Sequence, residues 1–209
     1  MNYKMDERKT IILDINDTVR AFTRQFLNCY KKAFDPASDM QLEDITEFNL
    51  MSVFPFEDTA AYNKFRYTDY AYDIHCLAPY TNERLRGAYE LWACNTLCDF
   101  DEELVPNLVI ASPLESGITI QSTLAWCSSH NMRQREYIFP MDSFKLWEKG
   151  DIIITANPNL IEAAPEGKVS IKIDMPYNTE TKATYSFPSM MDLIHDEKEV
   201  IKNIIENKQ

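Results

Sequence analysis

The side chains best suited to chemistry in this chain stand at the ends of short apolar runs. Asp14 ends the run TIILD, and Ser112 ends the run LVIAS. Thr155 ends the run DIIIT, which begins six residues after Lys145. Asp174 ends a further run, VSIKID. A carboxylate, hydroxyl groups and an ammonium group in these positions are candidates for a ligand-binding or catalytic site.

Five apolar runs have the composition of buried parallel strands. They are rich in β-branched residues and continuous rather than alternating, with helix-length segments between them. The runs are residues 10–14, 108–112, 137–139, 151–155 and 169–174. Helices are expected at residues 116–130, 159–164 and 189–207. The sequence therefore predicts an α/β fold, in which polar residues at the carboxyl ends of the strands meet at one edge of the sheet.

More than ninety residues separate the first two predicted strands, which is too many for one crossover connection. Apolar residues recur at helical spacing from Val19 to Tyr30 and again from Leu85 to Trp92. Residues 59–72 are rich in aromatic side chains and fit a third helix. We predict a helical cap of residues 19–100 over the carboxyl ends of the strands. Residues 1–18 and 101–209 then form the α/β core.

Charge and hydropathy exclude several classes of partner. The 21 Lys and Arg residues and 33 Asp and Glu residues give a net charge of −12, which disfavours binding to nucleic acid or to anionic membranes. No apolar run approaches the roughly 18–20 residues of a membrane span, and the polar start of the chain does not resemble a secretory signal. We expect a soluble cytoplasmic protein.

The cysteines and glycines exclude further types of site. Five cysteines and no visible signal argue against a disulfide framework. The four glycines form neither a GxGxxG nor a GxxxxGK[ST] phosphate loop. Cys94 and Cys98, with His75 and Cys76 upstream, suggest zinc, but the thiols lack the usual two-residue spacing and fit better as small apolar groups.

Four motifs, in this order, resemble those of the haloacid dehalogenase (HAD) phosphatase superfamily. IILDINDT (11–18) resembles motif I, VIASP (109–113) resembles motif II, and DIIITANP (151–158) resembles motif IV. Lys145 stands where motif III places its lysine. The Ser-Pro pair, the position of the cap and PYN (176–178) are most similar to the 5'(3')-deoxyribonucleotidases, which occur in cells and in phage genomes. The resemblance implies a HAD-like parallel sheet core with a helical cap inserted after the first strand.

The resemblance also implies a role for four residues. Asp14 matches the nucleophile, which attacks phosphate and forms an aspartyl-phosphate. Thr18, Ser112 and Lys145 match positions that surround and bind the phosphate. In the family, Mg²⁺ is held by the first aspartate, a backbone carbonyl and a motif IV aspartate, and it neutralises the phosphate.

Three positions depart from the family pattern. Asn16 replaces the aspartate that acts as general acid and base, a loss that alone costs about 10²–10⁴ in rate. Thr155 and Ala156 replace the motif IV acids, so the carboxylates that a hard cation prefers are missing. No cofactor is expected, and Mg²⁺ is expected only if the protein is active. Weak alternative metal ligands are Asp14, Asn157 and Asp174.

Each candidate also has a purely structural interpretation. Asp14 and Lys145 can form an ion pair at the strand ends, and Ser112 can cap the following helix. Asp17 is a poor replacement acid, because neighbouring residues leave a turn in different directions. The aromatic residues of the cap fit either a cap core or a surface that contacts a nucleobase or a protein. They are Tyr62, Phe65, Tyr67, Tyr70 and Tyr72.

The sequence favours a catalytically degenerate HAD-like protein that acts by binding, with a protein partner at the aromatic cap or a place in a larger assembly. One alternative is a module that binds a deoxynucleotide or phosphate. Another is a slow metal-dependent 5'-nucleotidase or phosphatase that uses Asp14 as its nucleophile.

Overall fold

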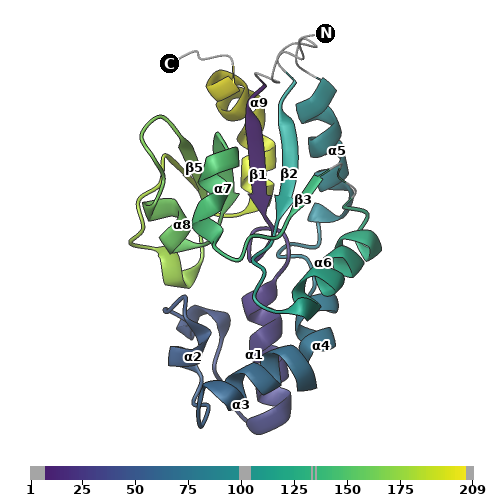
Figure 1. Ribbon diagram of the computed structural model, residues 1–209, viewed down its shortest axis with the longest axis vertical. Coiled ribbons are helices and arrows are strands. Elements are labelled where there is room, and N and C mark those ends of the chain that lie inside the picture. The colour runs from purple at the N-terminus through teal and green to yellow at the C-terminus, as the bar shows by residue number, and fades with distance from the viewer. Residues whose placement is uncertain (1–7, 99–104, 133, 135, 206–209) are drawn as a thin grey trace.

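The structure, a computed structural model, describes residues 8–98, 105–132, 134 and 136–205. Within these residues, six parallel strands form one sheet in the order β3-β2-β1-β4-β5-β6, and helices cover it (Figure 1). The strands are β1 (Thr10–Asp14), β2 (Asn107–Ala111), β3 (Glu136–Ile138), β4 (Ile152–Thr155), β5 (Val169–Ile173) and β6 (Tyr185–Phe187). The α/β fold and its first five strands therefore agree with the sequence prediction to within about one residue at most ends.

Alternate residues of the central strands β1, β2 and β4 face different layers of helices. Ile11 and Leu13 pack in the cluster formed with α5 (Leu85–Cys98), α6 (Gly117–Ser129) and α9 (Met190–Ile205). Ile12 packs in a second cluster with α7 (Leu146–Lys149) and α8 (Pro158–Glu162). Burial on both faces explains why these strands have continuous apolar sequences.

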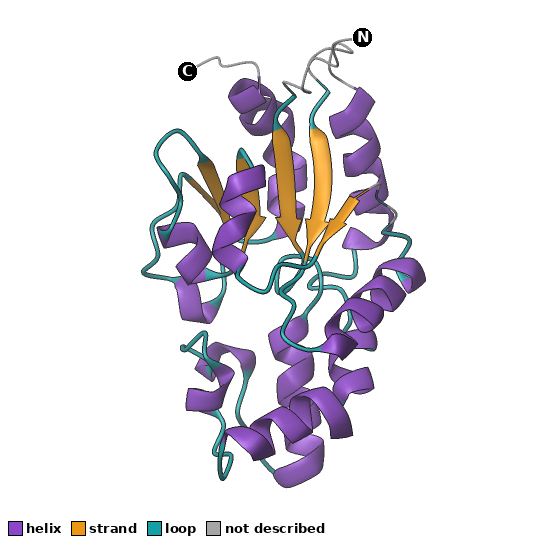
Figure 2. Ribbon diagram, viewed as in Figure 1, coloured by secondary structure: helices purple, strands orange, loops and turns teal. Residues whose placement is uncertain are grey.

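A second group of helices, which we call the cap, spans residues 22–76 and lies beyond the carboxyl ends of the strands (Figure 2). It has its own apolar cluster, in which Phe26 contacts the rings of Phe54, Tyr62 and Phe65 at centroid distances of 5.1 to 5.9 Å. The cap helices are α1 (Phe22–Phe34), α2 (Leu50–Val53), α3 (Thr59–Lys64) and α4 (Ala71–Cys76). The insertion after β1 thus places a separately packed unit over the sheet edge where ligands bind in α/β folds.

The structure corrects two expectations about the insert. Residues 59–72 do not form one helix, because a π-helical turn at Phe65–Asp69 separates α3 from α4. The helix α5 was expected in the cap but packs on the core, where Tyr89 and Trp92 join the cluster of the sheet and α9. Figure 1 shows α5 beside the sheet rather than among the cap helices.

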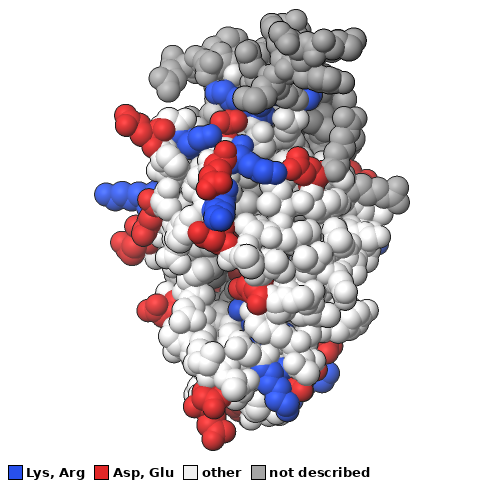
Figure 3. Space-filling view, viewed as in Figure 1, with Lys and Arg blue, Asp and Glu red and all other residues white. Residues whose placement is uncertain are grey.

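The surface carries both signs of charge. Figure 3 shows Lys and Arg interspersed with Asp and Glu on the viewed face, and the described residues there form no broad basic area. Within the described ranges, no helix is both long enough and apolar enough to cross a membrane.

Candidate functional site

The chain leaves β1 through a tight turn. The backbone N–H of Arg20 donates to the Ile15 carbonyl at 2.9 Å, and the Thr18 hydroxyl donates to the Asp14 carbonyl. Asp17 has a φ of 58°, in the left-handed region where Asp is one of the more frequent non-glycine residues. Thr18 is fully buried and lies outside the cleft described below. Its hydroxyl therefore closes the turn rather than facing a ligand.

Asp14, at the end of β1, is a buried carboxylate with one unused oxygen. Its side chain is 4% exposed. The Thr155 hydroxyl donates to Oδ2 at 2.8 Å, whereas Oδ1 has no hydrogen-bond partner among the described residues. Thr155 accepts in turn from the Asn157 backbone N–H at 3.0 Å, which leaves its own proton for Asp14. Burial raises the pKa of Asp14 to about 7, and the bond from Thr155, the nearby Asn16 backbone N–H and the charge of Arg20 only partly oppose this.

Arg20 is fully buried next to this turn, and the sequence patterns did not single it out. Its Nη2 and Nε donate to Asn16 Oδ1 at 2.5 and 3.0 Å, and Nη2 also reaches Ser112 Oγ at 3.4 Å. Its Nη1 donates to the Thr123 hydroxyl and to the His75 carbonyl. Burial lowers the pKa of Arg20 to about 10, so the guanidinium stays charged at neutral pH.

The contacts of Arg20 decide the state of two predicted site residues. Asn16, at the acid/base position, uses its carbonyl oxygen to hold the guanidinium. Ser112, at a predicted phosphate-binding position, is fully buried and lies beside the same group. An internal cation thus occupies the space between the side chains that the family resemblance assigns to proton transfer and phosphate binding.

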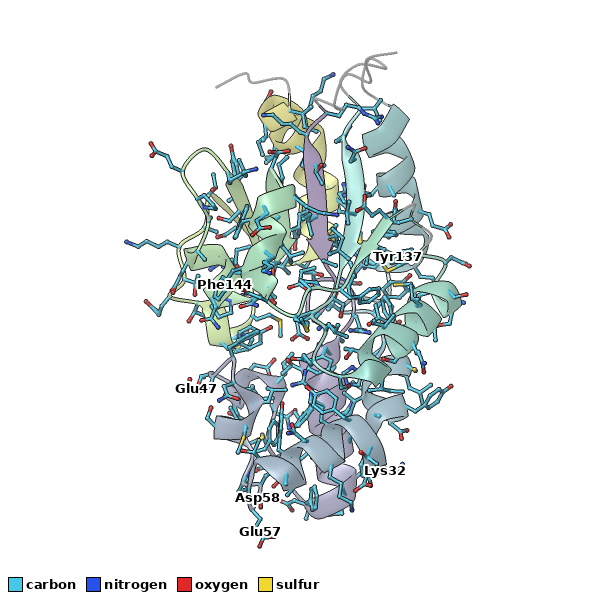
Figure 4. The ribbon with its side chains drawn as sticks, viewed as in Figure 1. Lys32, Glu47, Glu57, Asp58, Tyr137 and Phe144 are labelled. Atoms are coloured by element: carbon cyan, nitrogen blue, oxygen red, sulfur yellow. The ribbon has the colours of Figure 1, made fainter. Side chains whose placement is uncertain are left out.

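Lys145 does not join Asp14. No ion pair links them in the part of the chain that the structure describes, so the expected structural pair is absent. Lys145 ends a 3-10 turn, Ser143–Lys145, and its side chain is exposed and outside the cleft wall. Its neighbour Phe144 is labelled on the core side in Figure 4.

Asp17 is tied to the cap and to the end of the sheet. Its carboxylate accepts from the Thr23 backbone N–H at 2.8 Å and from the Thr23 hydroxyl at 2.5 Å. It also accepts from the Tyr177 hydroxyl at 2.9 Å. Burial raises the pKa of Asp17, and these bonds oppose the rise. With both oxygens engaged, Asp17 anchors the start of α1 and does not replace the missing acid.

A cleft of about 330 Å³ separates the core from the cap. Asp14 and Asn16 come from the turn after β1, Asn157 from the loop after β4, and Tyr62 from the cap. The remaining lining residues are Asp17, Phe22, Thr23, Phe48, Asn49, Leu50, Arg66, Pro113, Glu115, Asn159 and Tyr177. The predicted residues Thr18, Ser112 and Lys145 do not line it.

The cleft has more acidic than basic side chains. Asp14, Asp17 and Glu115 line it, against a single arginine, Arg66. Arg66 is already paired with Glu115, and it donates to the Tyr62 hydroxyl at 2.7 Å. Its guanidinium also lies 4.9 Å from the centre of the Phe22 ring. The one basic group of the cleft is therefore engaged within the protein.

The metal set expected in the HAD family does not fit these residues. Thr155 offers a hydroxyl that already donates to Asp14, and Ala156 offers no side-chain ligand. Asn157 lines the cleft, but its Oδ1 caps α8 by accepting from the backbone of Asn159 and Leu160. Among the described residues, no three His, Cys, Asp or Glu side chains are grouped as ligands.

Asp174 is also absent from the cleft. It pairs with Lys172 at 3.2 Å on a separate open depression. The alternative metal set of Asp14, Asn157 and Asp174 is therefore not brought together. The side chains of Cys94 and Cys98 lie outside the described set, so the structural role expected for them stays a prediction.

The aromatic residues of the cap are mostly part of its interior. Tyr62 and Phe65 are buried, and Tyr67 stacks on His75 with ring centroids 6.0 Å apart. Tyr72 is the exposed member of the set. His75 is buried with neither ring nitrogen hydrogen-bonded among the described residues, and burial lowers its pKa to about 3. His75 is thus a neutral packing residue between two arginines, Arg20 and Arg66.

Several side chains of the site are not predicted from the sequence. The carboxyl partner of Arg66 comes from another part of the chain, and Tyr177 reaches Asp17 across 160 positions. Arg20 left one usable signal: it lies four residues after Asn16 and between Val19 and Phe22 of the apolar stripe. An arginine in that position is either buried together with the neighbouring apolar side chains or interrupts their apolar face.

No protein-family model and no curated protein matches this chain. A solved structure that it resembles is a protein from Burkholderia xenovorans LB400, provisionally described as a haloacid dehalogenase-like hydrolase. The TM-score is 0.56 at 11% sequence identity, and the match covers 91% of this chain and 98% of that chain. The fold is HAD-like. At this identity the likeness extends to the fold alone, and the activity of this HAD-like chain has to be argued from its own side chains.

Proposed function

We propose that this HAD-like protein is a catalytically degenerate relative of the 5'(3')-deoxyribonucleotidases that acts by binding a ligand in the cleft between core and cap. The observation that supports this most is the buried guanidinium of Arg20, bonded to Asn16 and within reach of Ser112. It engages the amide at the acid/base position, and that amide has no proton to exchange at neutral pH.

The charges of the cleft argue against the two alternatives that need a phosphate. A phosphate dianion beside the ionised form of Asp14 is repelled by about 4 kcal/mol for each pair of like unit charges at about 4 Å and an effective dielectric constant near 20. Because the pKa of Asp14 is about 7, the carboxyl can bind a proton near neutral pH, which removes its own part of the repulsion but supplies no cation for the phosphate. Lys145, the cation expected to offset this, lies outside the cleft, and Arg66 is paired with Glu115. Neither a nucleotide-binding site nor a slow phosphatase is favoured by these residues.

A phosphatase assay tests the proposal. Purified protein and the Asp14→Asn variant are incubated with deoxynucleoside monophosphates and with p-nitrophenyl phosphate, each with Mg²⁺ or Mn²⁺. We expect equal phosphate release from the two proteins, at the level of the buffer. Metal-dependent turnover that is lost in Asp14→Asn would overturn the proposal and show that Asp14 is a working nucleophile.

A further inference from the structure

We propose that the cleft between core and cap binds a small organic cation, whose ammonium group is received by Asp14. This inference rests on the proposed binding function and specifies its ligand. The ligand proposed here is a cation, whereas the phosphate implied by the family resemblance is an anion. The support comes from the free oxygen of Asp14, the balance of charge in the cleft, and the hydrogen-bonding groups around it.

The first support is the unused oxygen of a buried carboxylate. Asp14 lines the cleft, and its Oδ2 is bonded to Thr155, which does not line it. Oδ1, which has no partner in the described part of the chain, is therefore the carboxylate atom left for a ligand. A buried acceptor without a donor costs stability, and an ammonium group supplies a charged donor for it.

The second support is that the other charges of the cleft are already satisfied. Glu115 and Arg66 pair with each other, and both oxygens of Asp17 accept bonds from within the protein. Asp14 is thus the lining carboxylate that still needs a charged partner, and the cleft offers no free cation to receive an anion among the described residues.

The third support is the pattern of donors and rings. Asn16, Asn49 and Asn157 each use Oδ1 as an acceptor within the protein, so their amide NH₂ groups remain as donors. Phe48 and Tyr177 form an aromatic wall with ring centroids 5.4 Å apart. A ligand with an ammonium group, a compact apolar body and a hydrogen-bond acceptor matches this pattern. A volume of about 330 Å³ is near the lower end for ligand sites.

Three probes that share a phenyl ring and differ in charge test the inference: 2-phenylethylamine, 2-phenylethanol and phenyl phosphate. Each is titrated up to 10 mM and followed by saturation-transfer NMR and by the shift in melting temperature. We expect the amine to bind with a millimolar dissociation constant, about tenfold or more tightly than the alcohol. Phenyl phosphate is expected not to bind and not to displace the amine.

Two variants locate the effect. Asp14→Asn keeps an acceptor for Thr155 but removes the charge. We expect it to weaken binding of the amine about tenfold and to leave binding of the alcohol unchanged. Lys145 lies outside the cleft, so Lys145→Ala is expected to leave the binding of all three probes unchanged. Similar binding of amine and alcohol, binding of phenyl phosphate, an unaffected Asp14→Asn, or no binding by any probe would each overturn the inference. None of these readouts involves phosphate release, so the proposed lack of turnover is judged separately.

Discussion

Asp14 and Arg20 stand on either side of the turn after β1. Their ionised forms carry opposite charges, and their hydrogen bonding differs. Arg20 uses all three of its nitrogens within the protein, whereas Asp14 keeps Oδ1 unpaired. The carboxylate receives its one side-chain bond from Thr155 instead of from the guanidinium. At the scale of single residues, the site therefore combines a satisfied cation with an unsatisfied acid.

Restoring an acid at position 16 is not expected to restore proton transfer. In Asn16→Asp, the new carboxylate would lie where Oδ1 now accepts from Arg20 at 2.5 and 3.0 Å. An ion pair of this kind lowers the pKa of the carboxyl, so it holds no proton to donate at neutral pH. We expect no phosphate release and a higher melting temperature.

The control for this prediction is Asn16→Ala, which removes the acceptor and leaves the guanidinium short of a partner. A loss of about 1–3 kcal/mol in the free energy of unfolding is expected. Phosphatase activity in Asn16→Asp would contradict the interpretation that Arg20 blocks this position.

Asp14→Asn is expected to stabilise the protein, and more so as the pH rises. The pKa of Asp14 is raised from 3.8 to about 7 by burial. Between these values the folded protein binds the proton more tightly than the unfolded chain, so the stability due to this group falls as the pH rises. Three pKa units correspond to about 4 kcal/mol as an upper limit.

Urea unfolding of wild type and Asp14→Asn at a series of pH values measures this effect. The difference in the free energy of unfolding should grow from pH 4 to pH 7 and be constant above that. A difference that does not change with pH would mean that Asp14 is not desolvated in the folded protein.

At the scale of elements, the sequence was informative where burial sets the pattern. The strands β1, β2 and β4 have apolar residues in the clusters on both faces of the sheet, so their continuous apolar runs predicted them. The edge strand β6 was missed, because Tyr185–Phe187 is three residues long and half exposed. The apolar stripe of α5 predicted a buried face but not its partner, which proved to be α9 and the sheet.

The candidate site was less predictable for physical reasons. Spacing along the chain placed Lys145 near the fourth strand, but the 3-10 turn that ends at this residue leaves its side chain exposed. Arg20 was missed because an arginine is ordinarily solvated, and its burial depends on partners as distant as Ser112 and Thr123. Asp14, Asn16 and Asn157 share the cleft as the strand-end rule predicts.

Two glycines at helix ends give opposite expectations for substitution by alanine. A Cβ at Gly150, which ends α7, would lie 2.9 Å from Ile12 Cδ1 and 3.1 Å from Ile153 Cγ1. Both isoleucines are fully buried, so Gly150→Ala is expected to cost about 1–3 kcal/mol by overpacking.

Gly117 is the matched position. It is the first residue of α6. Apart from its chain neighbours and the nearby backbone of its own helix, no described atom lies within 4 Å of the position that a Cβ would take there. Gly117→Ala is expected to stabilise the protein by about 0.4–1 kcal/mol. Denaturant midpoints of the two variants compare them directly, and a stabilising Gly150→Ala would show that the packing of α7 on β1 is loose.

At the scale of the whole molecule, the cap is held on the core by one direct ion pair and by contacts at the two ends of the cap segment. Arg66 of the cap pairs with Glu115 of the loop after β2. The Trp126 indole in α6 donates to the Ala78 carbonyl at 2.6 Å, just beyond the cap. Tyr177 reaches from the end of β5 to Asp17 at the entrance to α1. The first contact joins the cap directly to the core, and the other two hold the segments through which the chain leaves and enters the cap.

Removing one of these contacts is expected to loosen the cap. Glu115→Ala leaves Arg66, whose side chain is 10% exposed, without its charged partner. We expect a loss of about 1–3 kcal/mol in stability and faster hydrogen exchange in α1 and α4 than in β4.

Glu136→Ala serves as the control, because it breaks an ion pair with Lys149 whose members are 52% and 60% exposed. Such a pair contributes about 0–1 kcal/mol. Equal losses in the two variants would show that the Arg66 pair does not hold the cap.

The insertion of the cap after β1 also sets an order of events during synthesis. The apolar cluster of the cap is drawn from residues within 22–74, so the cap can pack as soon as that segment has emerged from the ribosome. β1 pairs with β2 and β4, both of which follow much later in the chain. At about 5–20 residues per second, β1 waits about 5–20 s for its first neighbour, and a folded cap is the nearest apolar surface that this strand meets in that time.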